Sequence, residues 1–238
     1  MELSEMDLVY TLGTYHGSQW ENNEIRYSLR SIEKNMPHRN IVIVGYCPEF
    51  LQNVIHIPVR DGAKHKSLNT LIKMKIACLS HKISQDFVLM NDDFYVLNPI
   101  TELPDYYKST LNTRLQHEKE RGSQGSRYYY TIKRTAELFD RPKDFDMHIP
   151  MKFNKKKFLD LFRNFDMHRI YLYRSVYGNF YDLKGERIDR DVKIFGVNDF
   201  YKQTGLTFMS LSPDAALKPA IQHFLEEMFP KLSKYERY

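Results

Sequence analysis

Residues 87–94 read FVLMNDDF, and this stretch decides how the rest of the chain is interpreted. Residues 87–90 of this stretch are all apolar and, together with Asp86 before them, are typical of a buried strand over 86–90. The run ends at Asn91, Asp92 and Asp93, where two adjacent carboxylates are costly to desolvate unless a cation offsets their charge. Asn-Asp-Asp also suits an ordinary solvated turn at the end of a strand, so the pattern alone leaves both interpretations open.

A hard divalent cation is the natural partner for such a pair. Mn²⁺ and Mg²⁺ prefer oxygen ligands and bridge readily to the phosphates of a substrate. We therefore take Asp92 and Asp93 as candidate metal ligands and expect Mn²⁺ or Mg²⁺ as the cofactor. Only one of them has to contact the metal, so the other is also a catalytic candidate that binds a substrate hydroxyl or orients the first. We assign that second role to Asp93.

The segments before this stretch alternate between strand and helix patterns. Strands are expected over residues 7–12, 40–45, 54–58 and 86–90. One helix is expected to start near Asn22 or Asn23, and a second helix to span 67–83. This order predicts an α/β fold with a mainly parallel central sheet flanked by helices. Ligands of such sheets bind beyond the carboxyl ends of the strands, where Gly13, the turn at Gly45 and residues 91–93 all lie. In the second helix the apolar residues that repeat at helical spacing are Leu68, Leu71, Ile72, Ile76, Leu79 and Ile83.

The second half of the chain is less regular. Residues 98–127 are polar and contain the sequence GSQGS, which predicts a mobile loop near 110–127. A late strand is expected over 206–211, followed by an amphipathic helix over 215–229 with Pro219 near its start, where a proline costs least. No internal repeat and no linker divides the chain, so we expect a single domain over residues 1–238.

Charge and composition restrict the partners and the compartment. The chain of 238 residues has a formal net charge of +5 and a sequence pI near 9.0, which favours polyanions such as nucleotide phosphates, nucleic acid or an anionic membrane surface. Its two cysteines, Cys47 and Cys78, lack the spacing of a zinc site. There is no signal peptide and no run long enough to span a membrane, so we expect a cytoplasmic protein.

Several polar residues occur in pairs or clusters that suit a phosphate-bearing ligand. Arg26 and Arg30 are four residues apart on one helix face, where they could clamp a phosphate or simply be solvated. Asn69 and Lys73 share the same spacing near a strand end, and their alternative is an ordinary polar helix face. Further along the chain, the candidates are His148, Arg174, Tyr177, Asn179, Asp191 and Lys193.

Taken together, segments along nearly the whole chain resemble the Stealth-type sugar-phosphate transferases, and more closely the small bacterial and phage glycosyltransferase-like proteins distantly related to them. Each segment is weak alone, but their order and spacing make the set specific. The segments that carry the resemblance are Asp7–Thr11, Asn23–Ile32, Asn91–Asp93, His148–Pro150, Asn154–Phe158, Arg174–Asn179 and Phe229–Glu236.

The resemblance implies a nucleotide-diphospho-sugar transferase fold of the GT-A kind, with residues 1–97 as the half that binds the nucleotide sugar and 98–238 as the acceptor half. By the same resemblance, Asp92 and Asp93 bind the metal and His148 lies near the reacting group. The donor is expected at Thr11, Gly13, Arg26, Arg30, Asn69, Lys73 and Asp92. The acceptor side is expected at Arg174, Tyr177, Asn179 and Asp191.

One departure bears on the reaction. Stealth proteins carry a Trp-Val-Asp/Asn-Gly stretch after the first strand, whereas this chain has LGTYHG over residues 12–17. We therefore expect glycosyl transfer from a UDP-sugar to an acceptor hydroxyl, with His148 or Asp191 as the base if the reaction inverts. The acceptor is a hydroxymethylated base in phage DNA or a polysaccharide, inside a bacterial or phage-infected cell. The alternatives are a Stealth-like hexose-1-phosphate transferase and a non-catalytic nucleic-acid-binding protein; the oligomeric state is not predicted.

Overall fold

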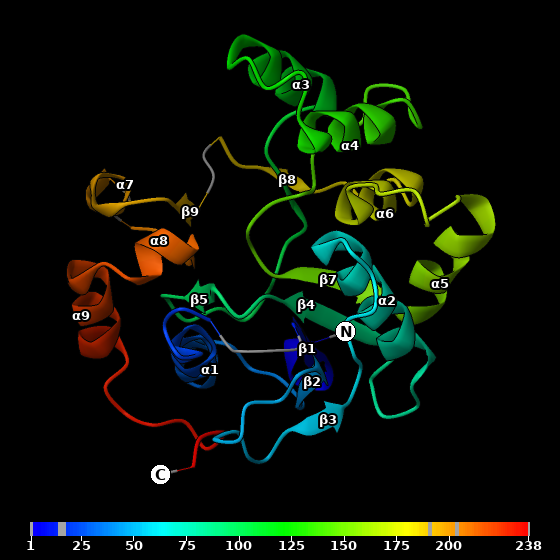
Figure 1. The fold of residues 1–238 in the computed structure, drawn as a ribbon. Coiled ribbons are helices and arrows are strands. Elements are labelled where there is room, and N and C mark those ends of the chain that lie inside the picture. Colours follow the sequence, from blue (N-terminus) through cyan, green and yellow to red (C-terminus); the bar gives the residue numbers. More distant parts are fainter. Residues whose placement is uncertain (1, 14–17, 190–191, 203–204, 238) are drawn as a thin grey trace. The chain divides into compact units, whose positions relative to one another are not determined.

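The computed structural model describes residues 2–13, 18–189, 192–202 and 205–237, and its chain divides into two compact units (Figure 1). The first unit comprises Met1–Leu103, His148–Lys155 and Val192–Tyr238, and the second comprises Pro104–Met147 and Lys156–Asp191. The chain thus leaves the first unit, returns to it for one short segment, leaves it again, and finally ends in the first unit. A division into halves at residue 97 does not describe this path, because the C-terminal residues fold with the N-terminal ones.

The first unit is built on a five-stranded sheet in the order β3-β2-β1-β4-β7. After a short 3₁₀ turn at Leu3–Glu5, β1 (Asp7–Leu12) pairs in parallel with β2 (Ile41–Gly45) and β4 (Asp86–Met90), and β2 pairs in parallel with β3 (Ile55–Ile57). Only β7 (Met151–Asn154) is antiparallel, on the far side of β4. β1, β2 and all but the first residue of β4 are buried almost throughout, which explains their continuous apolar runs and confirms the predicted mainly parallel sheet.

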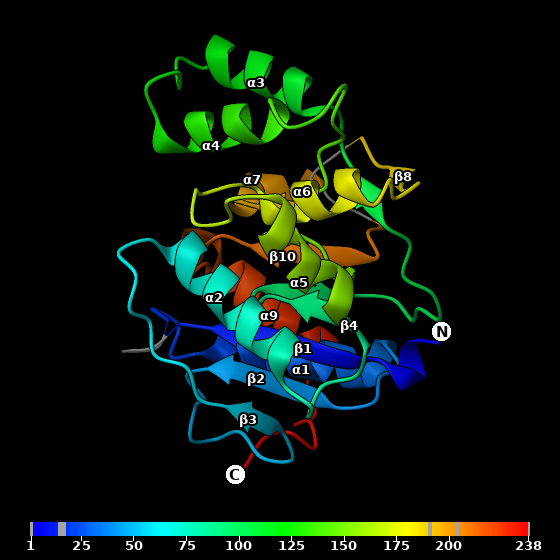
Figure 2. The ribbon, with the colours of Figure 1, turned by 90° about the vertical axis from the view of Figure 1, so that its right-hand side faces the viewer.

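Helices cover both faces of this sheet because the chain crosses it in two directions. From β1 to β2 it passes through α1 (Asn23–Asn35), and from β3 back to β4 it passes through α2 (Lys66–Leu79). A right-handed crossover in opposite directions places the two helices on opposite faces. Figure 2 shows α2 in front of the strands and α1 behind them.

The helix α1 is fixed to the sheet by an apolar face and by a buried hydroxyl. Its residues Ile25, Leu29 and Ile32 are at most 1% exposed, as their spacing predicted. On the same side, the Ser28 hydroxyl lies 2.9 Å from the Tyr10 hydroxyl of β1 and donates a hydrogen bond of 2.6 Å to the Phe94 carbonyl. The helix therefore links β1 to the segment that immediately follows Asp93.

The helix α2 buries only part of its predicted apolar repeat and ends at Leu79, before the predicted end at residue 83. Its buried residues are Leu71, Lys73, Met74, Ala77 and Cys78, whereas Ile72 is 38% exposed and Leu79 is 66% exposed. The apolar repeat identified the helix, but part of that repeat lies on the outward face. The reason is that Lys73 forms a buried ion pair and so takes the place that an apolar side chain would occupy.

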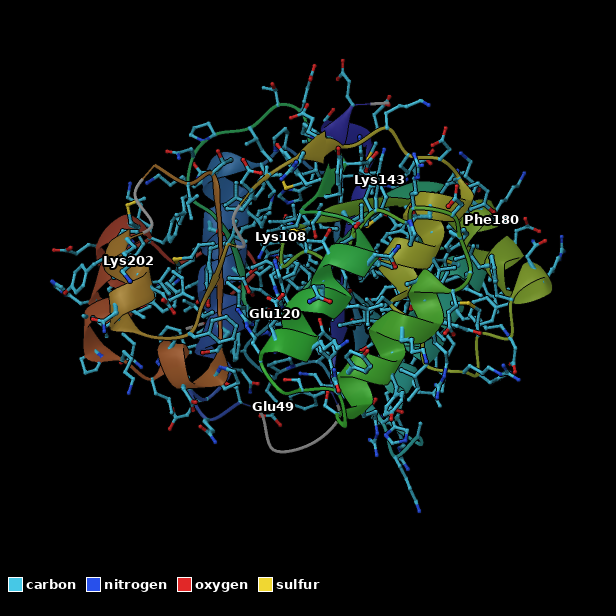
Figure 3. The ribbon with its side chains drawn as sticks, turned by 90° about the horizontal axis from the view of Figure 1, so that it is seen from above. Glu49, Lys108, Glu120, Lys143, Phe180 and Lys202 are labelled. Carbon is cyan, nitrogen blue, oxygen red and sulfur yellow. The ribbon has the colours of Figure 1, made fainter. Side chains whose placement is uncertain are left out.

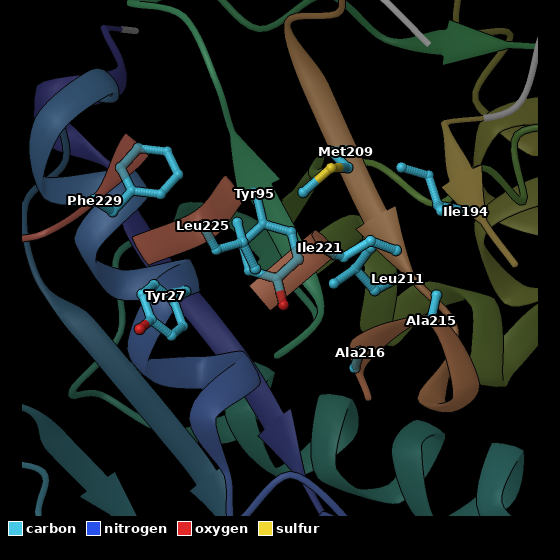
Figure 4. Packing of buried hydrophobic residues seen from close by; sticks show 10 residues of the cluster. All are labelled: Tyr27, Tyr95, Ile194, Met209, Leu211, Ala215, Ala216, Ile221, Leu225 and Phe229. Atoms are coloured by element: carbon cyan, nitrogen blue, oxygen red, sulfur yellow. The ribbon is translucent and has the colours of Figure 1, made fainter. Parts of the chain in front are cut away.

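A second sheet in the first unit has the order β5-β10-β9 and lies over an apolar cluster. Its strands are β5 (Phe94–Val96), β10 (Phe208–Leu211) and β9 (Lys193–Ile194), with β10 antiparallel to β5 and parallel to β9. The cluster includes Tyr95, Met209 and Leu211 from the sheet, Tyr27 from α1 and Leu225 from the last helix (Figure 4). This packing attaches the C-terminal part of the chain to the first 100 residues.

The C-terminal helical region is divided where one helix was predicted. After α7 (Val197–Lys202), the chain forms α8 (Pro213–Ala216) and then α9 (Pro219–Met228). Pro219 stands in the first turn of a new helix instead of continuing the previous one. A proline lacks the amide hydrogen for the helical bond and clashes with the carbonyl four residues earlier, so the helix must restart there.

The second unit is mainly helical. A helix forms within residues 110–127, where a mobile loop was predicted. This region contains α3 (Leu111–Glu120), and α4 (Arg127–Ala136) follows; the hydroxyls of Thr110 and Ser126 accept amide hydrogen bonds that cap them. The rest of the unit is β6 (Tyr106–Tyr107) paired with β8 (Glu186–Arg187), α5 (Lys155–Asn164) and α6 (Tyr173–Phe180). Within the described ranges, no helix is both long enough and apolar enough to cross a bilayer.

The C-terminal segment is fastened to α1 by a buried carboxylate. Glu236 has a fully buried side chain and binds Arg30 through two hydrogen bonds of 2.9 and 2.8 Å, with Arg26 at 3.3 Å. Its Oε1 also accepts hydrogen bonds from the amide and hydroxyl of Ser233. Burial alone would raise the pKa of Glu236, but the bonds from Arg30 and Ser233 outweigh it and hold that pKa below its usual value of 4.5.

We expect Glu236→Ala to lower the free energy of unfolding by about 3 kcal/mol, because it leaves two arginines without their buried partner. Since the carboxyl pKa is depressed in the folded state, the loss should be full above pH 4.5 and shrink as the pH falls through the folded-state value. Urea unfolding at several pH values measures it. Glu227→Ala, at a residue 68% exposed on α9, is the matched control, and an equal loss in both variants would contradict the assignment.

Candidate functional site

The carboxyl ends of β1 and β4 define the candidate site. From β1 the chain moves outward through β2 to β3, and then crosses back to place β4 on the other side of β1. The order of strands therefore reverses between β1 and β4, which is where open α/β sheets leave a crevice for ligands. Gly13 follows the end of β1, and Asp92 and Asp93 follow the end of β4.

Asp93 is held by two residues of the second sheet. Its Oδ2 accepts a hydrogen bond of 2.9 Å from the Ser210 hydroxyl and forms an ion pair with the Lys193 ammonium, which also lies 3.2 Å from that hydroxyl. The β9-β10 register pairs Lys193 with Ser210, so the sheet delivers both groups to one point. The protein itself thus balances the charge of Asp93 and fixes its position.

Asp92 carries the less balanced charge. The residue is exposed to solvent at the sheet edge, yet it is surrounded by enough protein that burial, followed by the neighbouring Asp93 carboxylate, raises its pKa to about 6. Lys66 at the start of α2 opposes this shift, whereas Glu24 near the start of α1 adds to it. An accessible carboxylate among like charges is suited to bind a cation.

Glu24 contributes negative charge to this edge, and no sequence pattern predicted this role. Its carboxylate accepts a hydrogen bond from the Ser18 hydroxyl, and that hydroxyl in turn accepts the amide of Asn22 at 3.0 Å. The left-handed backbone of Asn22 (φ 60°) shapes this turn, and Asn22 does not cap α1 with its side chain. Nearby, the fully buried Tyr95 hydroxyl has no hydrogen-bond partner among the residues that the structure describes, and burial followed by the Asp93, Glu24 and Asp92 charges raises its pKa.

The predicted donor-binding residues Asn69 and Lys73 hold the loop that precedes α2. The Lys73 ammonium is buried and forms an ion pair with Asp61, while the Asn69 amide bonds both the amide and the carbonyl of Ala63, at 2.9 and 3.0 Å. A Cβ on Gly13 would lie 3.7 Å from the Asp61 carboxylate, so this loop lies beside the end of β1. Asn69 and Lys73 therefore hold this loop in place, and the loop brings the Asp61 side chain beside the end of β1.

Gly45 makes this arrangement possible at the end of β2. Its φ of +116° is in a region that side-chain-bearing residues rarely adopt, and a Cβ there would lie 2.1 Å from the Leu12 carbonyl. The same Cβ would also lie 2.9 Å from the Lys73 side chain. The lysine can approach the sheet edge because this position is a glycine.

Thr11 and His148 lie on elements that end at the same edge. Thr11 is the second-last residue of β1 and is partly exposed. His148 precedes β7, whose antiparallel register pairs Met151 with Leu89 near the end of β4. His148 therefore lies three residues before β7, the strand that sequence reasoning missed, and on the side of the sheet where β4 ends.

Arg26 and Arg30 have a different partner from the phosphate that their spacing suggested. Both guanidinium groups bind Glu236, and that of Arg26 also lies over the Phe50 ring, 3.5 Å from its centroid. In this structure they attach the C-terminal segment to α1, and their assignment to donor phosphates stays a prediction. Arginines spaced four apart look the same in sequence whether they bind a phosphate or a distant carboxylate.

The predicted acceptor residues lie inside the second unit. Arg174 and Tyr177 are each 4% exposed, and Arg174 donates a hydrogen bond of 3.0 Å to the Met147 carbonyl. The Asn179 side chain bonds both the amide and the carbonyl of Lys143, at 2.8 Å each (Lys143 is labelled in Figure 3). The hydrogen bonds of Arg174 and Asn179 tie α6 to residues 143–147, and the acceptor role stays a prediction. The remaining candidate, Asp191, lies outside the described residues.

The donor set at Asp92 and Asp93 fits a hard divalent cation that takes further ligands from a substrate. No group of three or more His, Cys, Asp or Glu residues able to hold a metal occurs in the described part of the chain. A metal bound here would thus depend on one or two carboxylates together with substrate phosphates and water, which is the usual mode for Mg²⁺. The raised pKa of Asp92 and the excess of negative charge around it are consistent with this mode.

The charge at Asp92 predicts an effect on stability. Because its folded pKa of about 6 is above the usual 3.8, ionised Asp92 disfavours the folded state above pH 6, and this penalty fades as the pH falls from 6 toward 3.8. We expect Asp92→Asn to stabilise the apoprotein by about 1 kcal/mol at pH 7.5, after allowing for solvent screening. Thermal unfolding without divalent metal tests this, and a loss of stability at pH 7.5 would contradict it.

Comparison with known proteins agrees with this architecture. No protein-family model matches the chain, and no curated protein matches it. Among solved structures, the galactosyltransferase LgtC in complex with donor and acceptor sugar analogs aligns over 98% of this chain and 98% of its own, with 13% identity and a TM-score of 0.54. An active-site mutant of LgtC aligns over 96% and 98%, with 13% identity and a TM-score of 0.53. The chain therefore has the α/β fold of these glycosyltransferase structures, as the GT-A-like prediction expected.

Proposed function

We propose that this protein is a metal-dependent glycosyltransferase that moves a sugar from a UDP-sugar, or a similar nucleotide donor, to an acceptor hydroxyl. The observation that carries the proposal is the accessible Asp92 carboxylate with its raised pKa, beside Asp93, at the strand-order reversal of the sheet. The likeness to LgtC supports the fold in which such a site would work.

Asp92 and Asp93 would hold Mn²⁺ or Mg²⁺. When bound, such a cation neutralises the charge that develops on the leaving diphosphate. The Lys193 ammonium and the Ser210 hydroxyl hold the Asp93 carboxylate in place. Lys66, whose charge lowers the pKa of Asp92, adds positive charge near the position expected for the phosphates.

The acceptor hydroxyl must lose a proton as the new bond forms. His148 precedes β7, whose first residue pairs with Leu89 near the end of β4, and this position supports it as our candidate base, with Asp191 as the other. The proposed acceptor is either a hydroxymethylated base of phage DNA or a polysaccharide. The basic net charge of +5 suits the polyanionic DNA, and the LgtC structure with an acceptor sugar analog suits the saccharide.

The central test is donor turnover by Asp92→Asn. A thermal-shift screen of nucleotide sugars with and without Mn²⁺ first identifies the donor, because a bound ligand stabilises the folded state by mass action. With that donor, we expect Asp92→Asn to reduce Mn²⁺-dependent release of UDP at least about a hundredfold, since stabilisation of the leaving diphosphate is lost. Chromatography of the released nucleotide measures it.

Asp140→Asn, at an exposed aspartate of the second unit, is the matched control and should keep full activity. Undiminished Mn²⁺-dependent turnover by Asp92→Asn would refute the proposed site. Release of UMP instead of UDP would identify a Stealth-like hexose-1-phosphate transferase on the same site. Salt-sensitive DNA binding with no donor turnover would identify the non-catalytic nucleic-acid-binding protein.

A further inference from the structure

The outward face of α2 exposes aliphatic side chains that the protein core does not use. Leu79 is 66% exposed and Ile72 is 38% exposed, and Leu68 is partly exposed. At 100° per residue, Leu68, Ile72 and Leu79 lie within about 40° of one another on the helix surface. They therefore form one continuous apolar stripe, unlike a scatter of single exposed residues.

Lysines flank this stripe along one side. Lys75 stands three residues after Ile72 on α2 and so projects beside the stripe, and Lys82 is exposed three residues beyond the end of the helix at Leu79. Residues 62–85 contain five lysines and no aspartate or glutamate, in a chain that has 30 acidic residues. We call Leu68, Ile72, Lys75, Leu79 and Lys82 the α2 outer face.

The opposite face of the same helix is anchored in the first unit. Leu71, Met74, Ala77 and Cys78 are buried, and α2 packs on β1 and β2. Lys73 is held by its ion pair with Asp61. The helix is thus held to the sheet by its inner face, and Figure 2 shows it in front of the strands.

We propose that the α2 outer face docks on an anionic lipid bilayer surface. An aliphatic stripe with lysines at its edge is the pattern of a helix that lies in a membrane interface, with leucine and isoleucine among the acyl chains and ammonium groups at the phosphates. The absence of acidic residues from 62–85 matches this surface by charge. A nucleic acid would pair with the lysines but would gain nothing from Leu79 and Ile72, so these residues favour lipid.

Docking would bring a particular part of the chain to the membrane. The first turn of α2 contains Lys66, whose charge acts on Asp92, and the Asn69 side chain holds the loop at Ala63. The helix that meets the lipid is therefore continuous with the helix that borders the site. An enzyme bound in this way would meet acceptors that are carried at a membrane surface.

The test is binding of the full chain to vesicles, measured by sedimentation. Vesicles of 70% phosphatidylcholine and 30% phosphatidylglycerol are compared with vesicles of phosphatidylcholine alone, at low and high salt. We expect the double variant Leu79→Ser/Lys82→Gln to bind the anionic vesicles about tenfold more weakly. It loses one aliphatic side chain that would be buried in the bilayer and one positive charge. Both residues are exposed, so the substitutions should leave folding unchanged.

The matched control is Leu232→Ser/Lys231→Gln, which changes an exposed leucine and lysine elsewhere in the first unit. It should bind as the wild-type chain does. The proposal is overturned if the wild-type chain binds anionic vesicles no better than neutral ones, or if the control loses as much binding as the α2 variant. Binding to DNA that the α2 variant weakens, without vesicle binding, would also overturn it. Donor turnover without vesicles is independent of this result, so the two proposals fail separately.

Discussion

Parallel pairing of β1 with both β2 and β4 is the constraint on which the rest of this structure depends. Parallel neighbours must all end at the same edge, so Gly13, Gly45 and the Asp92-Asp93 pair are brought together although they are far apart in the chain. The crossovers that parallel pairing requires supply α1 and α2, and the first turns of these helices place Glu24 and Lys66 at that edge. The site is thus a consequence of strand direction.

The acidic residues of the first unit differ in how far hydrogen bonds and ion pairs compensate the burial of their charge. Asp7 is fully buried at the start of β1, but Arg39, Asn40 and the Ser84 amide bind its carboxylate and lower its pKa in spite of burial. Glu236 is satisfied in the same manner by Arg30. Among the described residues, Lys66 is the cation that opposes the shift at Asp92, and the pKa of Asp92 still rises. A charge that the fold leaves unbalanced at a ligand edge costs stability, and a bound cation would remove that cost.

The two faces of helix α2 have different surroundings: one packs on the sheet beside the candidate site and the other is exposed to solvent. One face contributes Lys73 and the buried apolar residues that hold the loop at Asp61 beside β1. The other face carries Ile72 and Leu79 into solvent. A helix with apolar residues on both faces would normally be buried all round; here the outward residues are flanked by lysines, and this combination is typical of an interfacial helix.

The sequence by itself determined the elements whose signals are local. β1, β2, β4 and α1 follow from apolar runs and helical spacing, and their order implied the ligand edge and the Asp92-Asp93 pair. Only the tertiary structure decided the partners of the charged residues, because the Lys193–Asp93 pair spans 100 residues and the Arg30–Glu236 pair spans 206. It also decided that the strand β7 exists, that α3 replaces a loop, and that Arg174 is buried. A charged side chain has the same local sequence pattern whether its partner is a ligand, water or a distant residue, and only the fold determines which one it meets.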